Sequence, residues 1–332
     1  MSRTGKGERP TMEMVATLAG VSTITVSRAL RGSELVRPEV RERIGQIANQ
    51  VGYRMNVAAR SLRTRESRTI AVVIDQFAHE NQSHADPLLL VLIGGLLETL
   101  TPANYSTLLT THEHFLASSA VGADGAIIVG QGENAHRLRQ VAALNLPIVA
   151  WGEPVPGVNV KVIGSDNQMG GKIAAEHLIA RGRSRLLFLG DTKHPEVAAR
   201  LAGFREALAS SEAMLVGALP CPFTPAGAAD AVRAALDEGK QFDGIFAASD
   251  FIAAGACDAL IERDIAVPGA VSIVGFDDAP VASVHRPSIT TIRQDGAMAG
   301  HALGAAIVDM VEGRPGEAAA ALPVELVVRE TS

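Results

Sequence analysis

Two short helical patterns joined by a glycine turn, between residues 12 and 30, constrain the fold of this chain more than any other feature. Thr11 can cap the first helix and Gly20 can end it, while Ser22 can cap the second. At a period of 3.6 residues, each pattern has an apolar face that can pack against the other across the turn. The apolar residues on these faces are Val15, Leu18, Ala19, Val26, Ala29 and Leu30. The pattern predicts a helix-turn-helix.

The outward side of the second helix is predicted to carry residues that can read DNA, because this is the helix that a helix-turn-helix offers to the major groove. These residues are Thr23, Ile24, Ser27 and Arg28. Arg28 has a fork-shaped cation that can bind a guanine, and Ile24 has an apolar tip that favours a thymine methyl group. A phosphate contact or an internal ion pair is the alternative for Arg28.

Two further helical patterns follow the predicted helix-turn-helix. Pro38 suits the first turn of a third helix, apolar residues recur at helical spacing up to Val51, and Gly52 can end it. Asn56 can then cap one more short helix that reaches Leu62. The first ten residues lack apolar periodicity and predict a disordered basic leader.

The charge of the chain is divided unevenly between its N-terminal part and the remainder. The whole chain has a net charge of −6, with 30 basic and 36 acidic residues. Residues 1–68 hold 13 of the basic and 6 of the acidic residues, so this part is +7 and the remainder −13. A basic head on an acidic body indicates a polyanion-binding module attached to a separate domain.

The length and composition of the chain indicate a large folded core and favour a cytoplasmic location. With 332 residues and 47% apolar content, the chain is long enough for two or three domains. No apolar run resembles a signal peptide or a membrane span, so we expect no membrane partner. Its two cysteines, Cys221 and Cys257, have no metal or redox spacing and are expected to be reduced core thiols. We expect neither a cofactor nor a metal.

From Thr69 the sequence alternates between strand and helix patterns, which predicts an α/β core. Two successive series of this kind predict two doubly wound lobes with parallel sheets. In such sheets, ligands bind in a crevice at the carboxyl ends of the strands. The predicted strands are 69–75, 106–111, 125–129, 148–151, 162–165, 185–190, 215–219, 244–248, 271–276 and 322–328. The predicted helices are 87–100, 133–144, 168–181, 197–210, 225–238, 250–263 and 298–311.

The chain resembles the lactose-repressor (LacI) family of bacterial transcriptional regulators. In the head, the matching residues are Val15-Ala16, Ala19-Gly20-Val21-Ser22, Thr25-Val26-Ser27-Arg28, Gly52-Tyr53 and Asn56 through Leu62. In the core, they are Gly275-Phe276-Asp277-Asp278, the run from Pro287 to Ile292, and Gln294-Asp295. The resemblance implies a sequence-specific regulator, expected to be a repressor, that binds a palindromic double-stranded operator as a homodimer. It would be nucleoid-associated when bound to DNA.

The resemblance also implies the domain organisation. We expect a leader at 1–10, a helix-turn-helix domain at 11–55, a hinge helix and linker at 56–67, and an effector-binding and dimerisation core at 68–332. The core would be periplasmic-binding-protein-like, type I, with its first lobe at about 68–162 and 293–318. Its second lobe would cover about 163–290 and 320–332. Relative to the family, the 109–124 region is short and 76–85 is an insertion.

The same resemblance implies which residues bind DNA and which bind the effector. Asn56, Ala59 and Leu62 would form a hinge helix that enters the minor groove, with Leu62 wedged into a base step. Leu62 could alternatively pack in a core under the helix end. The implied effector contacts are Asp86, Trp151, Arg200, Phe223, Ser249, Asp250 and Asp277. This mixture of aromatics with Asp, Arg and Ser favours a small-molecule effector that is a carbohydrate, although a purine or another small metabolite also fits.

Two other classes of function compete with a DNA-binding regulator. A cytoplasmic sugar-active enzyme would need catalytic residues such as His177 or Asp277, but no Gly-rich phosphate loop, metal spacing or nucleophile elbow appears in the sequence. A sugar-binding protein with an accessory basic head is the other alternative. The sequence indicates no catalytic residue, and a regulator is our interpretation. Whether the effector induces or co-represses is left open by the sequence.

Overall fold

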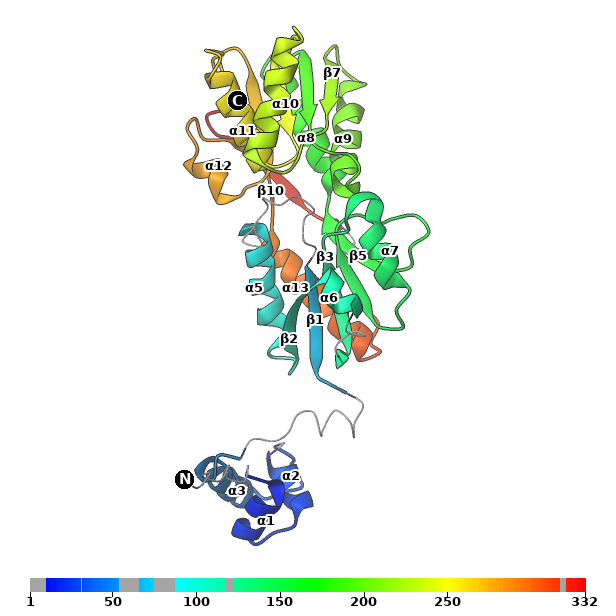
Figure 1. The fold of residues 1–332 in the computed structure, drawn as a ribbon, viewed down its shortest axis with the longest axis vertical. Helices are drawn as coiled ribbons and strands as arrows, with labels where there is room; N and C mark the ends of the chain where they lie inside the picture. Colours follow the sequence, from blue (N-terminus) through cyan, green and yellow to red (C-terminus); the bar gives the residue numbers. More distant parts are fainter. Residues whose placement is uncertain (1–9, 31, 54–65, 75–86, 118–121, 317–320) are drawn as a thin grey trace, which may run out of the picture. The chain divides into compact units, whose positions relative to one another are not determined.

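The fold is seen in a computed structural model, which describes residues 10–30, 32–53, 66–74, 87–117, 122–316 and 321–332 (Figure 1). The chain divides into two compact units, the first ending at Ser67 and the second beginning at Arg68. Within the described ranges, no helix combines the length and the apolar composition that crossing a membrane requires.

The first unit is built from short helices with the predicted caps. Its described helices are α1 (Met12–Ala19), α2 (Thr23–Leu30) and α3 (Pro38–Gln50). The hydroxyl of Thr11 accepts a hydrogen bond from the N–H of Met14, and Ser22 accepts one from the N–H of Thr25. Gly20 ends α1 in the left-handed conformation, at φ 64°. The predicted helix-turn-helix is confirmed.

Two side chains of the helix-turn-helix lie on the opposite side from that predicted. Leu18 is 56% exposed, because the buried stripe of α1 runs through Val15, Ala16 and Ala19 and leaves Leu18 at its edge. Ser27 is only 6% exposed, although we predicted it to face outward. Since α2 packs against both α1 and α3, its buried face is broader than that of a helix with one neighbour.

The first lobe of the second unit is a parallel sheet with helices on both faces. Its strands are β1 (Thr69–Ile74), β2 (Ser106–Thr111), β3 (Gly125–Val129), β4 (Ile148–Trp151), β5 (Lys161–Ser165) and β11 (Ala321–Leu322). They lie in the order β11-β5-β4-β3-β1-β2. Helices α5 (Pro87–Leu100) and α13 (Gly296–Val311) cover one face, and α6 (His112–Ala117) and α7 (His136–Ala142) cover the other.

The second lobe repeats this architecture with a larger apolar core. Its strands are β6 (Arg185–Leu189), β7 (Met214–Leu219), β8 (Gly244–Ala247), β9 (Ser272–Asp277), β10 (Thr290–Gln294) and β12 (Val324–Val327). They lie in the order β12-β10-β9-β8-β6-β7, and only β12 is antiparallel to its neighbour. Its helices are α8 (Asn167–Ala180), α9 (Pro195–Leu208), α10 (Pro225–Asp237), α11 (Asp250–Ile261) and α12 (Pro280–Val284). The predicted pair of doubly wound lobes is confirmed.

The chain crosses between the lobes at positions that differ from those predicted. Strand β5 pairs with β4 in the first-lobe sheet, so the predicted boundary at residue 163 falls inside this strand. Strand β10 belongs wholly to the second lobe. The single closing strand predicted at 322–328 is two strands, β11 in the first sheet and β12 in the second. A continuous apolar run cannot reveal such a crossing, because both sheets bury the same kinds of residue.

Several local elements also differ from the sequence-based expectation. The helix predicted at 133–144 is a short 3-10 turn, η2 (Glu133–Ala135), followed by α7. Asn134 and Ala135 both have positive φ values, 52° and 54°. These left-handed conformations separate η2 from α7 and so interrupt the predicted helix. Helices α6 and α12 and strand β10 were not predicted.

Candidate functional site

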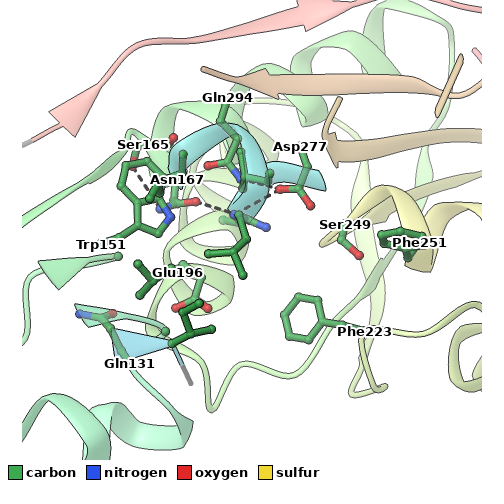
Figure 2. A pocket seen from close by; sticks show the side chains of 18 residues that line it. Gln131, Trp151, Ser165, Asn167, Glu196, Phe223, Ser249, Phe251, Asp277 and Gln294 are labelled. Carbon is green, nitrogen blue, oxygen red and sulfur yellow. Dashed lines mark hydrogen bonds and ion pairs between the residues drawn. The ribbon is translucent and has the colours of Figure 1, made fainter. Parts of the chain in front are cut away.

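A cavity of about 1000 Å³, including its opening, lies between the two lobes of the second unit (Figure 2). The strands of both sheets point their carboxyl ends toward it, as doubly wound folds do at their ligand sites. First-lobe strands contribute Ile74, Val129, Trp151 and Ser165 from their last residues. Second-lobe strands contribute Asp277 and Gln294 in the same way, and Ser249 follows β8 directly.

Most of the predicted effector residues that can be placed come together around this cavity. Trp151, Arg200, Phe223, Ser249 and Asp277 all line it, and in Figure 2 Trp151 lies across the cavity from Phe223, Ser249 and Asp277. The remaining predicted residues do not line it or cannot be placed. Asp86 lies outside the described residues, and so do the hinge positions Asn56, Ala59 and Leu62.

Arg200 is buried and directs its guanidinium to groups of the protein, whereas the resemblance implied a contact with the effector. Its Nε donates to the side-chain oxygen of Asn167 at 2.8 Å, and another nitrogen donates to the backbone carbonyl of Ala248 at 2.5 Å. A third nitrogen lies 4.0 Å from Asp277, and the guanidinium carbon lies 3.6 Å from the ring centre of Phe276. Burial lowers the pKa of Arg200, and the nearby carboxylate of Asp277 opposes that shift.

Asp250 does not line the cavity, which corrects its predicted contact with an effector. Its side chain is fully buried behind Ser249, and its carboxylate accepts a hydrogen bond of 2.7 Å from the N–H of Ala279. Burial, together with the charge of Asp277, raises the pKa of Asp250 well above its usual range. A Cβ atom at Gly275 would stand only 2.3 Å from its oxygen, so this carboxylate fills space that a glycine leaves. Of the adjacent polar pair, only Ser249 faces the cavity.

The structure adds polar lining residues that we did not predict. They are Gln131, Asn167, Glu196 and Gln294. Asn167 and Glu196 stand in the first turns of α8 and α9, the helices that follow strands β5 and β6. Their position after a strand was the available signal, since such turns face the crevice. The pattern gave no reason to prefer them over their polar neighbours.

Asn167 links the two lobes beside the cavity. Its amide nitrogen donates to Glu153, in the loop after β4, at 2.6 Å, while its oxygen accepts from Arg200. Burial raises the pKa of Glu153, the bond from Asn167 partly offsets this, and the nearby charge of Glu196 raises it further. Gln131 binds the backbone of Glu153 through both ends of its amide, at 2.7 and 3.0 Å.

The first unit has its own candidate surface on α2. Thr23, Ile24 and Arg28 are exposed there, and the side chain of Ile24 is 63% exposed. A large apolar side chain at such exposure suits a contact with another molecule. Arg43, by contrast, donates to the backbone carbonyl of Ala19 at 2.8 Å and so satisfies the carboxyl end of α1.

Comparisons with known proteins give matches to both units. The model of the family described as bacterial regulatory proteins, lacI family, matches residues 11–56, and that of the periplasmic binding protein-like domain matches residues 175–332. The HTH-type transcriptional regulator CelR of Thermobifida fusca is 31% identical, covering 97% of this chain and 98% of its own. The ribose operon repressor of Haemophilus influenzae is 28% identical, covering 87% of this chain and 88% of its own.

Solved structures agree with these matches. A CelR–cellobiose complex is 29% identical with a TM-score of 0.72, covering 98% of this chain and 100% of that chain. The lac repressor dimer bound to operator and the anti-inducer ONPF has a TM-score of 0.85, covering 98% of this chain and 99% of that chain. Its identity is 23%, so this second likeness concerns the fold.

Proposed function

This chain belongs to the lacI family of bacterial regulatory proteins and is a DNA-binding transcriptional regulator, and we propose that it represses its genes as a homodimer on a palindromic operator. A carbohydrate effector, bound in the cavity between the lobes, would change its affinity for DNA. The protein would act in the cytoplasm, on the nucleoid. The observation that carries this proposal is the joint lining of the cavity by polar and aromatic side chains of both lobes.

The DNA contacts that we propose begin with α2. Thr23, Ile24 and Arg28 are exposed on this helix, which a helix-turn-helix places in the major groove. Arg28 would bind a guanine through two parallel hydrogen bonds, and Ile24 would contact a thymine methyl group. The paired hinge segments of a dimer, with Asn56, Ala59 and Leu62, would enter the minor groove at the operator centre.

The effector contacts that we propose come from the cavity. Asp277 and Ser249 offer oxygens that can bind sugar hydroxyls, and Trp151 and Phe223 offer rings that can cover a sugar face. Arg200 would act through Asp277, which it faces at 4.0 Å. The CelR structure solved with cellobiose supports a carbohydrate as the class of effector.

A homodimer is supported by an exposed apolar face on helix α5. Leu90, Val91 and Leu97 are between 45% and 55% exposed on this one helix. Large apolar side chains exposed on one helix suit a surface that another protein covers. In a two-fold dimer the same patch would meet its own copy, because such interfaces are isologous.

Effector and operator would be coupled through the relative arrangement of the lobes. A ligand that touches both lobes can favour one arrangement over another, and it shifts DNA affinity only by its differential affinity for the two. Asn167 donates a hydrogen bond of 2.6 Å to Glu153 across the two lobes beside the cavity. A change in the arrangement of the lobes would alter this bond.

Fluorescence of Trp151, the only tryptophan, offers a direct test of the effector site. We would titrate the protein with mono- and disaccharides and with nucleobases, and use Trp151→Phe as the control for signal arising elsewhere. A saturable change with one carbohydrate, lost in Trp151→Phe, is the expected result. Saturable binding of a nucleobase with no response to any sugar would contradict the carbohydrate proposal.

Operator binding requires a separate measurement. We would select duplexes from a pool with randomised inverted repeats, and then measure binding as a function of salt with and without the effector. For a dimer that contacts many phosphates, we expect the affinity to fall steeply as salt is raised. We also expect the protein to protect both half-sites of an inverted repeat. Equal binding to single half-sites would contradict the dimer.

A further inference from the structure

Three side chains that can bind a metal ion come together from the two lobes, outside the lining of the cavity. Glu133 belongs to η2 of the first lobe, whereas Asp191 and His194 lie between β6 and α9 of the second. One ligand atom of each, a carboxylate oxygen or an imidazole nitrogen, lies within 4.8 Å of the other two. We call these three residues the interlobe triad.

Contacts between the two loops fix the position of the triad. The N–H of Asn134 in the first lobe donates to the carbonyl of Lys193 in the second at 2.7 Å. The N–H of Lys193 donates to the carboxylate of Asp191 at 3.0 Å. The ring of His194 meets the ring of Phe223 edge-on, with their centres 5.4 Å apart. Such supporting contacts orient the ligand groups of a metal site before the ion binds.

The charge of the triad favours a cation. Its two carboxylates, on Glu133 and Asp191, lie close to each other and to an imidazole. The Nζ of Lys193 lies 3.5 Å from Glu133, but the lysine side chain is 58% exposed, so this ion pair contributes little. Within the described ranges Asp191 forms no ion pair, and its carboxylate accepts only the backbone N–H of Lys193. A divalent ion supplies the positive charge that one exposed lysine does not.

The donor set determines the class of ion. Imidazole nitrogen together with carboxylate oxygens suits a first-row transition ion such as Zn²⁺, whereas Mg²⁺ and Ca²⁺ prefer oxygen ligands alone. Atoms that bind one ion at about 2.0–2.2 Å stand at most about 4.4 Å apart, so small side-chain rotations close the triad on an ion. Three protein ligands also leave a position for water.

The sequence gave no signal for this site, and we expected no metal. Asp191 and His194 are three residues apart in a loop, and two potential ligands at that spacing indicate nothing by themselves. Glu133 comes from the other lobe, so only the folded core adds the third ligand. Both segments follow parallel strands at their carboxyl ends, which is where doubly wound sheets place their binding groups.

We propose that Glu133, Asp191 and His194 bind one divalent transition-metal ion, such as Zn²⁺, that joins the two lobes. The ion needs ligands from both lobes, so it binds tightly only when the two loops are together and it stabilises that arrangement. None of the three residues lines the cavity. The site therefore goes beyond the proposed carbohydrate effector and does not depend on it.

Equilibrium dialysis against zinc chloride, followed by metal analysis, tests this site on the full-length protein purified without a histidine tag. The experiment contains neither DNA nor sugar, and its buffer binds zinc weakly. We expect saturable binding of one Zn²⁺ per chain that requires the triad.

Substitutions in each lobe test whether the ion bridges them. Asp191→Asn and Glu133→Gln should each weaken Zn²⁺ binding roughly 100-fold or more, because losing a group that only supports a ligand already costs about 10- to 100-fold. Asp191→Asn keeps an oxygen that can accept from the N–H of Lys193. His301→Ala is the matched control, because it removes an exposed imidazole that lies 2.8 Å from the carboxylate of Glu98, outside the triad. This control should leave the binding unchanged.

Lys193→Met gives a change in the opposite direction. The ammonium group of Lys193 competes with the ion for the carboxylate of Glu133. Removing this charge should tighten Zn²⁺ binding about two- to fivefold, as expected for an exposed ion pair. A weaker binding of Zn²⁺ by Lys193→Met would contradict the proposal.

The other outcomes also decide the proposal. Loss of binding in both Asp191→Asn and Glu133→Gln, with His301→Ala unchanged, supports an ion held between the lobes. Full binding by Glu133→Gln overturns the bridge, and full binding by Asp191→Asn or no saturable binding overturns the site. The proposed operator and carbohydrate effector are unaffected by any of these results, since neither ligand is present.

Discussion

Arg200 donates a hydrogen bond of 2.8 Å from its Nε to the side-chain oxygen of Asn167, at the point where the chain enters the second lobe. The amide nitrogen of Asn167 donates in turn to Glu153 of the first lobe at 2.6 Å. A single amide thus connects the first lobe to the buried cation beside the cavity. Its position suggests that changes here alter both the stability of the core and its response to ligand.

Asn167→Ala is expected to lower the free energy of unfolding of the core by about 1–3 kcal/mol, because it leaves the Nε of buried Arg200 without its acceptor. Denaturant unfolding would measure this loss. Gln168→Ala is the matched control, since Gln168 is the next residue in α8 and its amide donates to Glu206 at the surface. We expect a change within about 0.5 kcal/mol there. Equal losses in both variants would contradict the role assigned to Asn167.

Gly94 and Gly95 are neighbours on α5 for which we expect opposite effects of alanine. A Cβ atom at Gly95 would stand 2.4 Å from the backbone oxygen of Ala297 on α13, whereas one at Gly94 would meet nothing within 4 Å. Gly95→Ala should therefore destabilise the core by about 1–3 kcal/mol. Gly94→Ala should stabilise it by about 0.5–1 kcal/mol through helix propensity. Thermal unfolding of the two variants checks the sign of each change.

Arg28→Lys is expected to weaken specific operator binding by about 1–3 kcal/mol, because lysine keeps the charge but loses the planar fork that can bind a guanine. Binding to unrelated DNA should change little, since that binding depends on charge. The ratio of the two affinities, measured at one salt concentration, is the readout. A parallel loss on both kinds of DNA would instead make Arg28 a phosphate contact.

Asp278 makes the stability of the core sensitive to acid. Burial alone would raise its pKa, but bonds of 2.5 Å from Arg329 and 2.6 Å from Arg293 hold the pKa below its usual range. A folded-state pKa below the unfolded value means that the stabilisation is present above the unfolded pKa, about 3.9, and is lost as the pH falls through the folded one.

Asp278→Asn should therefore cost most at neutral pH, about 1.5–3 kcal/mol for charged hydrogen bonds, and progressively less below about pH 4. Denaturant unfolding across pH 2.5–7, roughly the range in which carboxylates titrate, would trace this dependence. Asp264→Asn, at an exposed position, is the control and should show little dependence. A cost for Asp278→Asn that stays constant with pH would show that the charge of Asp278 is not what stabilises the fold.

The sequence was sufficient for features that are local along the chain. Thr11, Gly20 and Ser22 have the caps and the turn expected of them, because capping depends on residues three positions apart. The helix at 87–100 and the strands at 106–111, 125–129 and 148–151 have the predicted bounds, because their apolar periods and flanking turns lie within each element. These elements in alternation were enough to predict two doubly wound lobes and a crevice at their strand ends.

Tertiary structure decided what depends on contacts between distant segments. Ser27 is buried because α1 and α3 both pack against α2, and Asp250 is buried because Gly275 leaves room for it. Arg200 binds Asn167 and Ala248, residues 33 and 48 positions away in the chain, so no local pattern could show that its donors are engaged. Glu196 likewise faces the cavity because of how α9 packs on the sheet. Side-chain direction at a strand end is set by such packing, and residue type alone does not determine it.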